Sequence, residues 1–166
     1  MVFWKRANTP PEREQVSAQL LRLIRTQLPE ADAETVEIVT ATAGLIACVA
    51  YADRQLHEAE RAHARALLGR VHGLAAEGIE AICELLERHL QELAVVNPHA
   101  YTRVLREQTD VQTRLEVLDV LLELALVDSE LSFAETQLQR RLTGALGLEQ
   151  QDYNVAQARH KARLSS

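Results

Sequence analysis

The chain of 166 residues has little cysteine, proline or glycine: two cysteines, four prolines and six glycines. Scarce helix breakers and an apolar set rich in Leu and Ala favour an all-helical domain. Cys48 and Cys83 each lie inside an apolar stretch, and two cysteines cannot build a disulfide framework. We therefore expect two small buried side chains in a reducing, cytoplasmic protein, without a disulfide or a thiolate metal site.

Positive charge is also short, because 18 Lys and Arg face 24 Asp and Glu and the net charge is −6. A surface that tracks phosphates needs net Lys and Arg, so the balance argues against nucleic acid as a partner. The acids gather in residues 29–60 and 106–135, each with a formal charge of −6, whereas residues 1–28 and 136–166 are each +3. Such clusters attract cations or basic partners, although acids also gather at helix N-termini for stability alone.

Several signatures of other protein classes are missing. No secretory signal, nucleophile elbow, phosphate-binding glycine loop or dinucleotide fingerprint occurs, so we assign no catalytic residue. The apolar run 38–52 is shorter than the roughly 20 residues that a membrane span needs. Residues 1–10, which include Phe3 and Trp4, are predicted to form an N-terminal arm, and residues 11–166 a single domain.

What the sequence does contain is the pattern Asp-x-x-Leu-x-x-x-Glu, twice, 75 positions apart. Residues 53–60 read DRQLHEAE and residues 128–135 read DSELSFAE, and each copy follows a long apolar run. A helix that is apolar all round must be buried, so the two runs are expected to pack side by side. The sequence thus predicts an all-α, single compact domain of about seven or eight helices. In it, two pseudo-repeated helix-turn-helix units surround two buried central helices.

Apolar periodicity and cap residues place the individual helices. They are expected at residues 11–28, 32–52, 58–71 and 79–93, in a short segment around 98–105, and at 115–127, 132–144 and 150–164.

The repeated acids have a structural explanation. Ser132 and Glu135 have the spacing of a capping box, in which each side chain bonds the other residue's backbone N–H. His57 and Glu60 hold the same frame, with His57 the poorer cap. The two Asp residues that open the copies can bond N–H groups of their turns. Capping alone accounts for the four repeated acids.

A divalent cation site is the alternative explanation. Hard cations take several carboxylate oxygens, and Ca²⁺, Mg²⁺, Mn²⁺ or Zn²⁺ are the candidates. If the two turns converge, the ligands would be Asp53, Glu60, Asp128 and Glu135, with Glu130 as a further acid. Neither turn has the alternating acids and central glycine of an EF-hand.

A helical enzyme with a carboxylate-bound metal is the third alternative. Glu60 and His63 form a Glu-x-x-His motif of the kind found in di-iron proteins. Such sites need two of these motifs, and the second half of the chain has Leu138 where the first has His63.

Residues 50–60, AYADRQLHEAE, and residues 125–135, ALVDSELSFAE, resemble the repeated signature of the TerB-like domain family, Ala-x-Ala-Asp-Gly-x-hydrophobic-x-x-x-Glu. The resemblance covers about residues 35–160. It implies a fold of about seven helices with pseudo-twofold repeats, a link to tellurite and other stress responses, and metal-binding or protein-interaction roles near the membrane. It also implies that the four repeated acids are the carried-over positions.

The chain departs from that signature at the glycine after each Asp, which is Arg54 in the first copy and Ser129 in the second. Glycine there would permit a left-handed backbone and close approach to a ligand. Arg54 adds a positive charge that competes with a cation, so the second turn is the better candidate.

From these observations we expect a cytoplasmic, non-enzymatic interaction module with a protein partner, in a stress-response or membrane-proximal complex. Any membrane proximity would come through the partner. A homodimer and a cation-binding protein are the alternatives.

Overall fold

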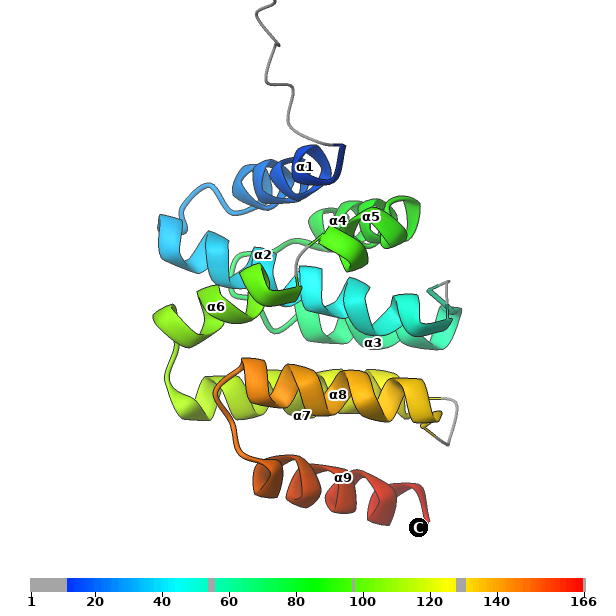
Figure 1. Ribbon diagram of the computed structural model, residues 1–166. Coiled ribbons are helices and arrows are strands. Elements are labelled where there is room, and N and C mark those ends of the chain that lie inside the picture. The colour runs from blue at the N-terminus through cyan, green and yellow to red at the C-terminus, as the bar shows by residue number, and fades with distance from the viewer. Residues whose placement is uncertain (1–11, 54–55, 97, 128–130, 166) are drawn as a thin grey trace, which may run out of the picture.

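The computed structural model describes residues 12–53, 56–96, 98–127 and 131–165 (Figure 1). These residues form nine α-helices and one 3-10 turn, with no strand among them, which confirms the predicted all-α class. The predicted arm, residues 1–10, lies outside them. The elements are α1 (Glu12–Gln27), α2 (Ala33–Ala50), η1 (Tyr51–Asp53), α3 (Glu58–Leu68), α4 (Ala76–Arg88), α5 (Leu90–Val96), α6 (Pro98–Gln108), α7 (Val111–Ala125), α8 (Phe133–Ala145) and α9 (Gln150–Leu164).

Helix α2 forms the centre of the bundle. Asp32 caps it by accepting a hydrogen bond of 2.7 Å from the backbone N–H of Thr35. Among the described residues α2 alone is long and apolar enough to cross a membrane, and 67% of it is buried inside the molecule. Helices α1, α5, α6 and α7 pack against it. Its apolar surface is therefore used mainly by packing within the bundle.

Helix α7 is the second central helix, as the repeat predicts. Asp110 caps it by accepting a hydrogen bond of 2.8 Å from the N–H of Thr113, so the helix begins at Val111, four residues before the predicted start. It packs against α2, and α3, α8 and α9 pack against it. In Figure 1, α1 lies at one end of the stack of helices and α9 at the other.

Two further predictions of helix extent were wrong. The helix expected at 79–93 is interrupted at His89, whose backbone (φ −121°, ψ 30°) leaves the helical region between α4 and α5. The apolar spacing continues from Leu86 through Leu90 to Leu93, so periodicity could not show the break. The helix expected at 58–71 ends at Leu68, and Gly73 (φ +86°) lies in the turn that follows.

A close approach of helices fixes the position of α6 on α2. A Cβ atom on Gly44 would lie 2.5 Å from the ring of Tyr101, so only glycine allows this contact. The Tyr101 hydroxyl lies 3.0 Å from Oγ of Ser17, which joins α1 to the same contact. Three helices thus meet at one buried aromatic ring.

Candidate functional site

The two motif copies start two helices in the same way. The residues before α3 and α8, His57 (φ −66°, ψ 158°) and Ser132 (φ −63°, ψ 164°), have nearly the same extended backbone. The N–H of Ser132 donates to the Glu135 carboxylate at 2.6 Å, and the N–H of Glu135 donates to Ser132 Oγ at 3.2 Å. The N–H of His57 donates to Glu60 at 2.8 Å. These bonds confirm the capping function predicted for both Glu residues.

The same geometry bears on the predicted cation site. Glu60 and Glu135 are buried, with exposed fractions of 4% and 9%, and each carboxylate bonds a backbone N–H. In the described residues no three His, Cys, Asp or Glu side chains are placed to hold a metal ion, so this part of the chain does not fit such a site. The side chain of Asp53 and all of Asp128 and Glu130 lie outside the described residues. The cation site therefore stays a prediction.

The first copy is tied to the helix that follows it. Glu80 of α4 accepts from Arg61 at 3.2 Å and from Arg65 at 3.1 Å, and Arg65 also bonds Glu58 at 2.9 Å. Arg61 reaches Glu87 as well. The hydrogen bonds from Arg65 and then Arg61 lower the pKa of the Glu80 carboxyl. This network joins α3 to α4. Its sequence signal was the four-residue spacing of the arginines on one helix face.

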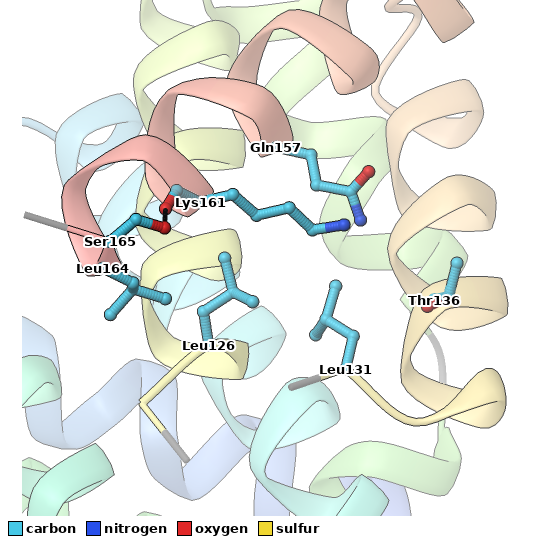
Figure 2. Close-up of a pocket in the computed structure, with 7 residues that line it drawn as sticks. All are labelled: Leu126, Leu131, Thr136, Gln157, Lys161, Leu164 and Ser165. Atoms are coloured by element: carbon cyan, nitrogen blue, oxygen red, sulfur yellow. Dashed lines mark hydrogen bonds between the residues drawn. The ribbon is translucent and has the colours of Figure 1, made fainter. Parts of the chain in front are cut away.

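The second copy stands beside an open cavity of about 390 Å³, formed by the end of α7, the start of α8 and the end of α9. Its lining combines apolar and polar side chains: Leu126, Leu131, Thr136, Gln157, Lys161, Leu164 and Ser165. Figure 2 shows Leu126 and Leu131 pointing into the cavity and Lys161 extending across it toward Gln157. The Gln157 amide donates to the Tyr153 hydroxyl at 3.1 Å, which holds this wall in place.

The cavity has the chemistry of a binding site. Leu126 and Leu131 can cover an apolar group, and the Lys161 ammonium can pair with a neighbouring carboxylate. Within the described residues Lys161 has no ion pair. Phe133, 80% exposed on the first turn of α8, adds apolar surface close in sequence to Leu131. Sequence reasoning missed the cavity because its lining comes from three helix ends that are distant along the chain.

A protein-family model matches most of the chain. The model of the family described as tellurite resistance protein TerB matches residues 39–158. That range runs from the first half of α2 into α9 and contains both motif copies. Searches of curated proteins and of solved structures found no match. The family match confirms the resemblance seen in the repeated signature, and the chain belongs to the TerB family.

Proposed function

We propose that this TerB-family chain is a non-enzymatic interaction module that binds a partner protein at the cavity between α7, α8 and α9. The observation that carries the proposal is the lining, in which three leucines and Lys161 border one cavity. A partner side chain that is apolar and adjoins an Asp or Glu matches this surface. A volume of about 390 Å³ suits one or two such side chains.

The setting of this interaction is proposed from the family. The matching family is described as tellurite resistance proteins, which supports a stress-response role. We place the chain in the cytoplasm, in a complex near the membrane, with membrane proximity supplied by the partner. Size-exclusion chromatography with light scattering would distinguish a homodimer from a monomer that awaits another protein.

Site-directed photo-crosslinking tests the cavity. A photoreactive phenylalanine analogue at Leu164, a cavity-lining residue that is 57% exposed, should trap the partner, which mass spectrometry then identifies.

Binding of that purified partner should weaken at least about tenfold in Lys161→Glu, because an attractive charge becomes repulsive. Arg25→Glu, on exposed α1 surface, is the matched charge control and should bind like the wild type. Equal binding by both variants would reject the cavity as the site.

The cation-binding alternative has its own test. Titration with Ca²⁺, Mg²⁺, Mn²⁺ and Zn²⁺ should raise the melting temperature if the folded chain holds a cation. Asp128→Asn should abolish that increase, whereas Ser132→Ala should lower stability equally with and without metal. An unchanged melting temperature at millimolar metal would exclude a cation site of useful affinity.

A further inference from the structure

A second surface lies between α3 and α7. Two cavities, of about 210 and 310 Å³, adjoin there and share Leu67, Arg70 and Val120. Leu67 and Val120 are only partly buried, so this groove keeps an apolar floor in contact with solvent. It shares no lining residue with the cavity of Figure 2.

Ionisable residues line the two edges of the groove, basic types on one side and acids on the other. His63 and Arg70, seven positions apart, lie on the α3 side, and Glu116 and Glu123, also seven apart, lie on α7. Seven residues are about two helical turns, so Glu116 and Glu123 face the same way about 10 Å apart on α7, whereas Arg70 lies in the turn that follows α3. Among the described residues Arg70, Glu116 and Glu123 take part in no ion pair. Their charges are available to a ligand.

The internal repeat indicates what fits this groove. The 75-residue offset relates α2 to α7 and α3 to α8, so the groove between α7 and α3 corresponds to the place between α2 and α8. That place is filled by a helix, because α6 packs on both α2 and α8. No described helix packs extensively on both α7 and α3.

Burial at equivalent positions agrees with this reading. Ala41, Leu45 and Cys48 of α2 have exposed fractions of 2%, 0% and 4%. The equivalent residues of α7 are Glu116, Val120 and Glu123, of which the first is exposed and the others partly buried. The stripe that is covered in α2 is thus uncovered in α7 and carries acids at its edge.

We propose that the groove between α3 and α7 binds an amphipathic helix of a partner protein. The apolar stripe of that helix packs on Leu67 and Val120 in the position that α6 takes on the other repeat. Basic residues seven apart along one flank meet Glu116 and Glu123, and an acidic residue on the opposite flank meets Arg70. The inference rests on the proposed interaction role, but the residues that line the groove differ from those of the Figure 2 cavity, so variants can test the two separately.

Two fluorescein-labelled synthetic helices test this proposal by anisotropy against the full chain. Both have about three heptads with the same leucine stripe. The first has Lys on one flank and Glu on the other, and the second has Glu on both flanks. The wild type should bind the first peptide roughly tenfold more tightly, because the second opposes acid to Glu116 and Glu123. A helix can lie in the groove in either direction, so a peptide with exchanged flanks would not discriminate.

Protein variants complete the test. Glu116→Lys/Glu123→Lys makes both edges basic and should reverse the preference in favour of the second peptide. Val120→Glu should abolish binding of both peptides, with circular dichroism showing that the variant is folded. Lys161→Glu should leave peptide binding unchanged, since it alters only the other cavity. Equal binding of the two peptides by the wild type, or no change of preference in the double variant, would overturn the proposal.

Discussion

The first repeat, α2 with α3, and the second, α7 with α8, start from the same motif but end in different surroundings. Later helices cover α2, and ion pairs with Glu80 join α3 to α4. In the second repeat α7 keeps an uncovered stripe and the start of α8 borders an open cavity. The motif thus specifies how a helix begins, while the neighbouring helices decide whether the unit is core or surface.

One pair of equivalent positions shows this difference clearly. Gly44 of α2 receives the Tyr101 ring of α6. Asp119, its counterpart in α7, lies 3.1 Å from Arg159 and 3.4 Å from His160, both on α9. Tight aromatic packing in one repeat is replaced by a partly exposed Arg159–Asp119 ion pair in the other.

The largest expected effect on stability comes from the contact between Gly44 and the Tyr101 ring. Gly44→Ala should lower the free energy of unfolding by about 1–3 kcal/mol, because its methyl group overlaps the Tyr101 ring. In an exposed helix the same change would be stabilising by about 1 kcal/mol. Asp119→Ala should cost no more than about 1 kcal/mol. Urea denaturation followed by circular dichroism measures both.

A double variant checks the cause. Tyr101→Leu removes the ring, so adding Gly44→Ala to it should cost clearly less than in the wild type. Additive losses would mean that the ring is not responsible.

Changes to the helix caps should have the next largest effect on the free energy of unfolding. Ser132→Ala removes the acceptor for the N–H of Glu135 and should cost about 1 kcal/mol. His57 has the same extended backbone as Ser132, so His57→Ser should gain about 0.5 kcal/mol by supplying a better cap. A loss in His57→Ser would show that the histidine side chain has contacts worth more than a cap.

The ion pairs of the first repeat predict a pH dependence. The folded pKa of Glu80 is lowered, chiefly by Arg65, so its stabilisation is present above the ordinary carboxyl pKa and disappears as the pH falls below about 4. Glu80→Gln should therefore lower the melting temperature at pH 7 and not at low pH. Added salt should shrink the difference at pH 7. Glu123→Gln in the second repeat, which lacks a described ion pair, is the control and should show no such pattern.

The last effect is confined to alkaline pH and concerns Cys48, whose counterpart in α7 is Glu123. Burial raises the pKa of the Cys48 thiol from 9.0 to about 12. The unfolded thiol ionises first, so its contribution is complete below pH 9.0 and is lost as the pH rises toward 12. Cys48→Ala should weaken the fall of stability across this alkaline range. An unchanged slope would contradict the burial argument.

Much of the fold could be predicted because its signals are local. The spacing of Ser132 and Glu135 predicts a helix start, since a cap needs only residues within one turn. The apolar run of α2 predicts that this helix is buried, although it does not show which helices cover it. The break at His89 was missed because the apolar spacing continues across it. The sequence identifies Glu60 and Glu135 as a repeated pair of candidate ligands. Their burial and their hydrogen bonds arise only when the helix ends have folded, so the sequence pattern did not show them.

The all-α class, the duplication, the starts of α3 and α8 and the family could be read from the chain alone, because periodicity, capping and the signature are short-range patterns. Only the folded chain brings Lys161 of α9 into one cavity with Leu126, just after α7, and Leu131, just before α8, and places the acids of α7 across a groove from Arg70. Those juxtapositions arise from packing between helices that are distant in the chain. No local pattern encodes them, since the same motif is accompanied by ion pairs to α4 in one repeat and by an open cavity in the other.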